Sequence, residues 1–228
     1  MEAFVRWSPR RSITGKRAAL RATVALCALL LALPAAAAAQ AGGDRGGETS
    51  RVGLEATGGV VLPSGDLAAF ADPGFSAGAA LSVPVARDLS IRVDGELDLP
   101  DRDVPAAPLI NVYSATAGLE YVARQREPGR VPLRTALRLG GGVSVVEAAE
   151  MPVAAPAGSE FSESYLTLTA GARLGYPLTS SLVAYLSPGV RWFRMPEEDA
   201  DRLTEGLAAA PPENGWMVPV RAGLRLAF

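Results

Sequence analysis

Residues 216–228, with the sequence WMVPVRAGLRLAF, alternate between two faces without a break. Every second position from Trp216 to Phe228 is apolar or aromatic, and the positions between them include Arg221 and Arg225. A period of two over this length predicts one long β-strand with an apolar face and a more polar face. Strands of soluble proteins are about five or six residues long, whereas a tilted strand that crosses a bilayer needs about 9–11 residues. The segment is therefore typical of a strand that spans a membrane.

The same alternation occurs in seven segments upstream of this strand. The clearest is 89–99, where aliphatic side chains alternate with Ser, Arg, Asp and Glu over most of the segment. In segment 182–193, Pro188 interrupts the pattern and would remove a hydrogen bond from a closed sheet, so we expect a bulge there. Together with the last segment, the pattern predicts an all-β fold, an eight-stranded antiparallel up-and-down transmembrane barrel. The seven segments are 52–62, 75–85, 89–99, 109–121, 131–145, 165–178 and 182–193.

The connections between these segments alternate between short and mostly longer ones, as expected of a barrel with short periplasmic turns and long external loops. In the last connection, Pro196 followed by acidic residues predicts a short surface helix over about 197–209. The short or moderate connections are 86–88, 122–130 and 179–181, and the longer ones are 63–74, 100–108, 146–164 and 194–215.

The first 39 residues are typical of a secretory signal peptide. Basic residues precede an apolar stretch, TVALCALLLAL, at 23–33, and Ala37 and Ala39 provide a small-x-small cleavage site. Cys27 is the single cysteine and would leave with this segment, so no disulfide or thiolate site is expected in the mature chain. The expected organisation is a signal peptide at 1–39, a short polar leader at 40–50 and a barrel at 51–228.

Without residues 1–39, the chain is acidic. It keeps 16 of its 22 basic and 23 of its 24 acidic residues, a net charge of −7. A nucleic-acid partner is disfavoured because no basic face or run remains. No other stretch is long and apolar enough for a transmembrane helix, so any span must be made of strands.

Two orientations of the strands compete: a soluble, lipocalin-like ligand-binding barrel with its apolar face inward, and a membrane barrel with that face outward. Aromatic side chains on the apolar face gather at both ends of the strands around an aliphatic band. Bilayer interfaces select such belts, whereas a soluble core would more often place its largest rings in the middle. The membrane orientation is therefore favoured. The belts comprise Phe75, Tyr113, Trp192 and Trp216 at the long-loop ends, with Tyr121, Tyr176 and Phe228 at the short-turn ends.

Charge burial then predicts what lies inside the barrel. Four arginines near the middle of their strands would each cost roughly 2–4 kcal/mol if they faced lipid, or about 8–16 kcal/mol together, comparable to the stability of a typical domain. An eight-stranded barrel is wide enough only for side chains, so we expect a packed ionic network instead of an open pore. Its predicted members are Glu55, Arg92, Asp94, Glu96, Asp98, Glu120, Arg134, Arg138, Arg173, Arg191, Arg221 and Arg225.

The chain resembles the transmembrane domain of the OmpA/OmpX-like family of small outer-membrane barrels. The resemblance rests on the strand plan, on LPSGDL at 62–67, on Pro73-Gly74-Phe75 opening the second strand, and on the terminal Phe228. It implies a bacterial outer-membrane location reached through the signal peptide, contact with lipid and lipopolysaccharide, and recognition of Phe228 as an assembly signal by the barrel-assembly machinery.

Some small outer-membrane barrels are enzymes, and the lipid-modifying ones use a Ser-His-acid type of arrangement. This chain contains no His, so a serine lacks its usual base. Asp94, Glu96 and Asp98 share one face and could do acid-base chemistry, but we interpret them as partners of the arginines. We therefore expect no catalytic residue, metal site or cofactor.

The predicted role is that of a monomeric outer-membrane barrel with a structural or surface-interaction function through acidic external loops. Three alternatives stay open: a narrow, porin-like channel, a lipid-modifying enzyme, and the soluble lipocalin-like barrel.

Overall fold

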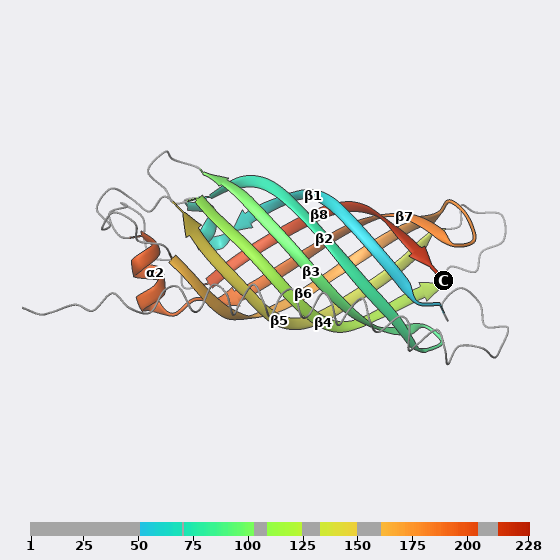
Figure 1. Ribbon diagram of the computed structural model, residues 1–228. Coiled ribbons are helices and arrows are strands. Elements are labelled where there is room, and N and C mark those ends of the chain that lie inside the picture. The colour runs from blue at the N-terminus through green and yellow to red at the C-terminus, as the bar shows by residue number, and fades with distance from the viewer. Residues whose placement is uncertain (1–50, 70, 103–108, 125–132, 150–160, 205–213) are drawn as a thin grey trace, which may run out of the picture. The chain divides into compact units, whose positions relative to one another are not determined.

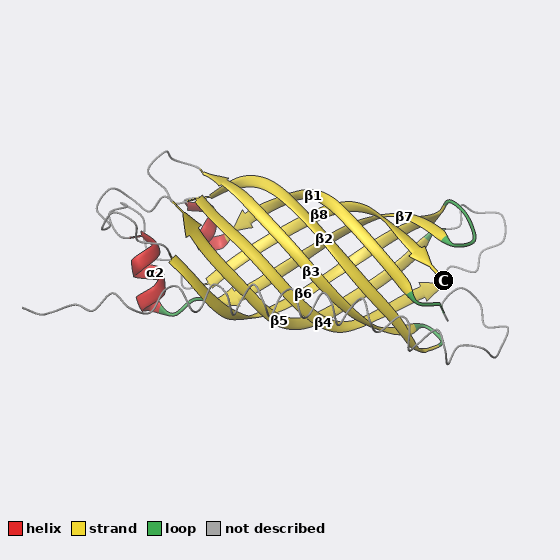
Figure 2. Cartoon of the chain, in the orientation of Figure 1, coloured by secondary structure: helices red, strands yellow, loops and turns green. Residues whose placement is uncertain are grey.

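The computed structural model describes residues 51–69, 71–102, 109–124, 133–149, 161–204 and 214–228. Eight antiparallel strands pair in chain order, and β8 pairs with β1 to close the barrel (Figures 1 and 2). The expected signal peptide and leader at 1–50 lie outside the described residues. The strands are β1 (Gly53–Ser64), β2 (Ala71–Ala86), β3 (Leu89–Arg102), β4 (Leu109–Arg124), β5 (Arg134–Ala149), β6 (Phe161–Pro177), β7 (Leu182–Arg194) and β8 (Asn214–Ala227).

Among the described residues, two short helices accompany the strands: the 3-10 helix η2 (Gly65–Ala69) between β1 and β2, and α2 (Glu197–Thr204) between β7 and β8. Within the described part of the chain, neither is long and apolar enough to cross a membrane. The helix predicted over 197–209 is present as α2, and residues 205–213 lie outside the described ranges. Figure 1 shows α2 at one end of the barrel and the C-terminus at the other. We call these the loop end and the turn end.

The strands are longer toward the loop end than the sequence predicted. The connections expected at 63–74 and 100–108 are reduced to residues 65–70 and 103–108. The pairing of Ala71 with Arg102 continues the β2–β3 ladder beyond the apolar alternation. Backbone pairing needs no apolar face, so strands can extend past the region that their side-chain pattern marks. The difference in length between the two sets of connections is therefore smaller than predicted.

The bulge expected at Pro188 is absent. The β6–β7 register is the same on both sides of this residue, where Gly171 pairs with Gly189 and Leu174 pairs with Leu186. The hydroxyl of Ser187 donates to the carbonyl of Ala172, which faces Pro188, at 3.3 Å. A neighbouring side chain thus supplies a hydrogen bond where proline has no N–H to give. Register shifts occur instead near both ends of β2.

The pairing register fixes the tilt of the strands. Followed once around the barrel from strand to strand, it leads from Gly53 to Pro63, a displacement of ten residues along β1. With about 3.3 Å per residue and about 4.8 Å between strands, this displacement over eight strands corresponds to a tilt of roughly 40°. Residues at equal height on adjacent strands are therefore offset from their direct partners by about 1.25 positions.

The outer surface is apolar and has the aromatic belts at its two ends. After correction for tilt, the four loop-end aromatics lie within about two residues of one another in height, and Tyr121 and Tyr176 lie about nine residues lower. That separation is about 23 Å along the barrel axis, close to the ≈ 25 Å apolar band of membrane barrels. Six of the seven predicted belt side chains are exposed and Trp192 is half-buried. At mid-height the outward side chains are mostly small: Ala56, Ala79, Gly95, Ala117, Ala170 and Ala222.

We predict that an outward charge destabilises the barrel according to its depth. Leu139 lies at mid-height and is 69% exposed on the outer surface, so Leu139→Arg should lower the free energy of unfolding in lipid vesicles by about 2–4 kcal/mol. Leu178→Arg, in the turn between β6 and β7, is the matched control and should cost about 0–1 kcal/mol. Urea titrations that give equal losses for both variants would contradict the outward orientation of the apolar face.

Candidate functional site

The polar face of the strands forms a continuous set of charged side chains inside the barrel. These residues alternate with the outward apolar ones and are mostly buried, with Arg191 and Asp98 at 0% exposure. Residues far apart in the chain meet there because the closed sheet turns all eight polar faces toward one axis. Most of the ion pairs belong to two groups, one nearer each end of the barrel.

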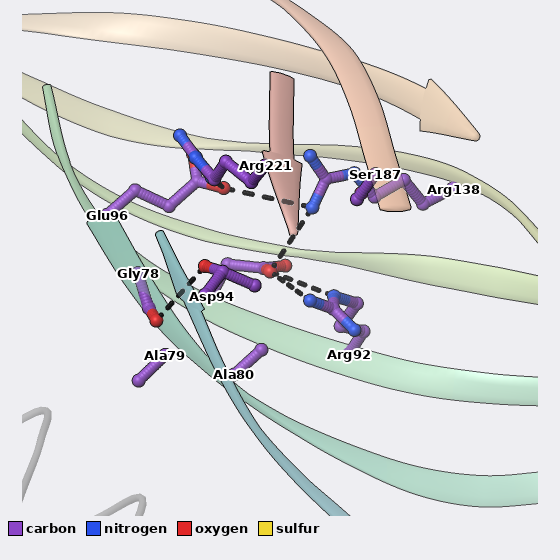
Figure 3. Close-up of a pocket in the computed structure, with 10 residues that line it drawn as sticks. Gly78, Ala79, Ala80, Arg92, Asp94, Glu96, Arg138, Ser187 and Arg221 are labelled. Atoms are coloured by element: carbon purple, nitrogen blue, oxygen red, sulfur yellow. Dashed lines mark hydrogen bonds and ion pairs between the residues drawn. The ribbon is translucent and has the colours of Figure 1, made fainter. Parts of the chain in front are cut away.

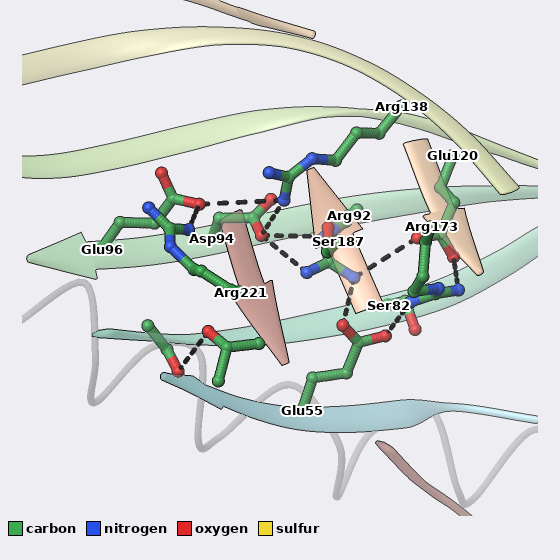
Figure 4. Close-up of polar contacts among 12 residues, drawn as sticks. Glu55, Ser82, Arg92, Asp94, Glu96, Glu120, Arg138, Arg173, Ser187 and Arg221 are labelled. Atoms are coloured by element: carbon green, nitrogen blue, oxygen red, sulfur yellow. Dashed lines mark hydrogen bonds and ion pairs between the residues drawn. The ribbon is translucent and has the colours of Figure 1, made fainter. Parts of the chain in front are cut away.

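The first group, the turn-end cluster, consists of Glu55, Arg92, Glu120, Arg173 and Arg225. Figure 4 shows the first four of these residues. Arg92 contacts Glu55 at 2.6 Å and Glu120 at 3.3 Å. Arg173 pairs with Glu55 and lies 2.7 Å from Glu120, so the two arginines bind the same two acids. Arg225 contacts Glu120 at 3.2 Å and Glu55 at 3.7 Å. Each buried carboxylate is thus shared among three guanidinium groups, which compensates its lost hydration.

The second group, the loop-end cluster, consists of Ser76, Glu96, Asp98, Arg191 and Arg221. Arg191 and Arg221 both pair with Glu96 and Asp98. The Ser76 hydroxyl donates to Asp98 and accepts a hydrogen bond from Nε of Arg221. Planar guanidinium groups suit this arrangement because they can donate to two acids at once.

Asp94 and Arg138 connect the two clusters. Asp94 accepts a hydrogen bond from Nε of Arg92 at 2.8 Å. Arg138 lies 3.5 Å from Asp94 and 3.7 Å from Glu96, so its ion pairs are loose. A cavity of about 10 Å³ lies beside these groups, with Arg221 also in its wall (Figure 3). This is room for about one water molecule.

An apolar plug, which the sequence reasoning missed, fills the loop end of the interior. Its twelve members are all buried, and the rings of Tyr165 and Phe193 stack with centroids 5.9 Å apart. The available signal was the apolar inward positions at the loop ends of β4 and β5, where Val112 and Val146 continue the inward register and Asn111 and Glu147 occupy the outward one. The members are Val61, Leu67, Ile110, Val112, Val146, Ala148, Phe161, Tyr165, Phe193, Met195, Ala200 and Met217.

Helix α2 packs onto this plug. Ala200 is 1% exposed, and the hydroxyl of Tyr165 donates to Asp199 at 3.2 Å. After the tilt correction, the plug lies at or beyond the height of the loop-end aromatic belt. The interior is therefore charged where the barrel crosses the apolar band and apolar above it.

The structure brings eleven of the twelve predicted network residues into the two clusters and their connection. The twelfth, Arg134, is the first residue of β5 and is half-buried. Trp192 and Trp216 are partners across β7 and β8, with ring centroids 6.3 Å apart. The backbone N–H of Phe228 donates to the carbonyl of Val52 at 3.0 Å, and the Phe228 side chain is exposed.

Comparisons with known proteins agree with this fold. No protein-family model matches the chain, and no curated protein sequence is significantly similar to it. Among solved structures, Neisserial surface protein A (NspA) matches with a TM-score of 0.57 and 14% identity over 78% of this chain and 97% of that one. A major outer membrane protein from Thermus thermophilus matches with a TM-score of 0.47 and 13% identity, over 78% of this chain and 99% of that one. The N-terminal β-barrel domain of Pseudomonas aeruginosa OprF matches with a TM-score of 0.45 and 13% identity, over 78% of this chain and 98% of that one.

The chain thus has the fold of the small eight-stranded outer-membrane β-barrels. Its outward apolar face excludes the soluble barrel with an inward apolar core.

We predict that the charge network stabilises the fold as a unit. Arg92→Met removes the contacts with Glu55, Glu120 and Asp94, and should lower the free energy of unfolding by about 3–5 kcal/mol because buried acids lose their partner. The exposed Arg194, at the end of β7, provides the control. Arg194→Met should change the free energy of unfolding by less than about 0.5 kcal/mol. Equal urea midpoints for Arg92→Met and the wild type would show that the network contributes no stability.

Proposed function

We propose that this protein is an integral outer-membrane barrel with a structural or surface-interaction role, carried by its acidic external loops and not by transport or catalysis. The observation that carries the proposal is the filled interior. Charged side chains occupy the membrane-spanning part, and the apolar plug occupies the loop end. With the interior filled, the surface of the loop end is the part of the molecule that we propose to interact with partners outside the cell.

The filled interior argues against a channel. Among the described residues, the cavity beside Asp94 and Arg138 has room for about one water molecule. An ion crossing the barrel would have to separate ion pairs such as those of Arg191 with Glu96 and Asp98. It would then have to enter an apolar region where a charge has no partner. Both barriers lie in series along the same axis.

The loop end carries the acidic surface that the proposal requires. Glu197, Glu198 and Asp201 of α2 are exposed, while Ala200 of the same helix is buried against the plug. One face of the helix is thus fixed to the barrel and the other is charged. Such a surface suits cationic or polar partners, or divalent cations that bridge acids to lipopolysaccharide.

Catalysis is disfavoured by chemistry. The chain contains no His, and the three carboxylates on β3 that could replace it are engaged by arginines. The oxygens of these carboxylates already accept hydrogen bonds from guanidinium groups inside the barrel, so they are not presented to a substrate. Unchanged lipid A in a strain lacking the protein would agree with a non-enzymatic role.

The proposed partners are outer-membrane lipid and lipopolysaccharide around the barrel, and the barrel-assembly machinery during insertion. We propose a monomer, because one chain closes the sheet by itself. The assembly role of Phe228 and the export role of residues 1–39 belong to the same proposal. Equal amounts of folded, heat-modifiable protein with and without Phe228 would contradict the former.

We predict that the purified protein does not conduct. In planar lipid bilayers it should produce no reproducible current steps, because the ionic clusters and the plug block the axis in series. A barrel known to form an open pore, reconstituted in the same way, is the positive control. Uniform current steps that scale with the amount of inserted protein would overturn the closed interior and favour the channel.

We also predict that α2 faces the outside of the cell. In a Cys27→Ala background, Glu198→Cys should react with a membrane-impermeant maleimide in intact cells. The matched control is Ser180→Cys, exposed in the turn between β6 and β7, which should react only after the outer membrane is permeabilised. The reverse labelling pattern would place the acidic loops on the periplasmic side and remove the basis for surface interaction.

A further inference from the structure

We propose that the interior of the barrel binds one small monovalent anion, of the size of chloride, beside Arg138. Three observations support this site: the balance of buried charges, the loose contacts of Arg138, and the cavity next to its guanidinium group. None of them depends on the external loops or on a surface role.

The described ion pairs of the interior contain one more positive than negative group. Six arginines meet five acids, and each acid already contacts at least two of the arginines. A buried charge without compensation is costly, and lipid around the barrel removes the screening that water would give. A small anion inside this network would offset the surplus charge. The arginines are Arg92, Arg138, Arg173, Arg191, Arg221 and Arg225, and the acids are Glu55, Asp94, Glu96, Asp98 and Glu120.

The surplus charge is located at Arg138. Its nearest carboxylate oxygens are 3.5 and 3.7 Å away, whereas each of the other five arginines has a carboxylate oxygen within 3.2 Å. Its Nε is buried and has no hydrogen-bond partner within the described part of the chain. A charged donor in this state is the group that an anion would bind most strongly.

The strands around Arg138 leave room for its guanidinium group. A Cβ added at Gly171 would lie 2.7 Å from Nε, and one added at Gly189 would lie 2.9 Å from a terminal nitrogen. Side chains at these two positions would therefore displace the group. The glycines of β6 and β7 let Arg138 lie across the interior, and Figure 3 shows its guanidinium group directed toward Asp94 and Glu96, which also line the cavity.

The cavity selects the size and charge of its ligand. Arg92, Arg138 and Arg221 line it together with the hydroxyls of Thr57 and Ser187, and Asp94 and Glu96 complete the wall. Arg138 supplies the donor for an anion, because its Nε has no partner among the described residues. The hydroxyls of Thr57 and Ser187 donate to backbone carbonyls, and the guanidinium nitrogens of Arg92 and Arg221 contact acids or Ser76. At about 10 Å³ the space is of the order of one water molecule, so a halide fits with small side-chain movements and sulfate or phosphate does not.

Chloride-dependent stability of the full barrel in detergent tests the site. Unfolding by urea is measured in sodium chloride and in sodium gluconate at equal ionic strength. For the wild type, the apparent unfolding constant should fall about tenfold for each tenfold rise in chloride above its dissociation constant, with no such effect of gluconate. Arg138→Gln should lose this dependence, while the control Arg134→Gln, on the same strand, should keep it.

Crystals soaked in bromide provide a second measurement that does not depend on the folding of a variant. An anomalous peak within about 3.5 Å of the Arg138 guanidinium group is expected. A cavity that holds only water in such crystals, or equal effects of chloride and gluconate on the wild type, would overturn the proposal. Either outcome leaves the non-conducting surface role intact, because that role rests on conductance and labelling.

Discussion

The structure depends on one constraint: a bilayer accepts no charge on the outside of the barrel, and an eight-stranded barrel has only side-chain-sized space inside. All membrane-embedded charges must therefore share that space and neutralise one another. Arg92 and Arg173 bind the same pair of acids, and Arg191 and Arg221 bind a second pair, because so narrow an interior leaves few other positions. The packed charged interior is then a consequence of charge burial.

Register converts this constraint into particular contacts. Glu55 and Arg173 are 118 residues apart in the chain. They meet because the displacement of ten residues around the barrel places Glu55 on β1 and Arg173 on β6 at the same height, near the turn end. A slip of one residue in any strand would turn its charges toward lipid. The interior network and the outer apolar band therefore specify the same register. A shift in register would both break ion pairs inside the barrel and expose charges to lipid.

Much of the fold follows from sequence because a period of two is a direct consequence of strand geometry, and belts mark where each strand meets the interface. The membership of the network follows from the same alternation. The pairing of Arg221 with Asp98 and the long contacts of Arg138 do not follow from the alternation. The first depends on the shear of the barrel, and the second on the glycines at 171 and 189. Pro188 misled the prediction because the compensating hydrogen bond comes from a side chain, that of Ser187.

The plug was hidden for a different reason: at the loop ends of β4 and β5 the inward side chains, such as Val112 and Val146, are apolar, and Asn111 and Glu147 face outward. This is the reverse of the alternation that marks the lipid-facing side of the membrane-spanning part. Those ends lie beyond the apolar band, where the interior no longer has to hold the charges of membrane-spanning strands. Apolar side chains there give helix α2 a surface to pack on. Met195 and Ala200 are buried in the plug, and Asp199 accepts a hydrogen bond from Tyr165. The acidic face of α2 is thus held in place by side chains that fill the loop end of the barrel.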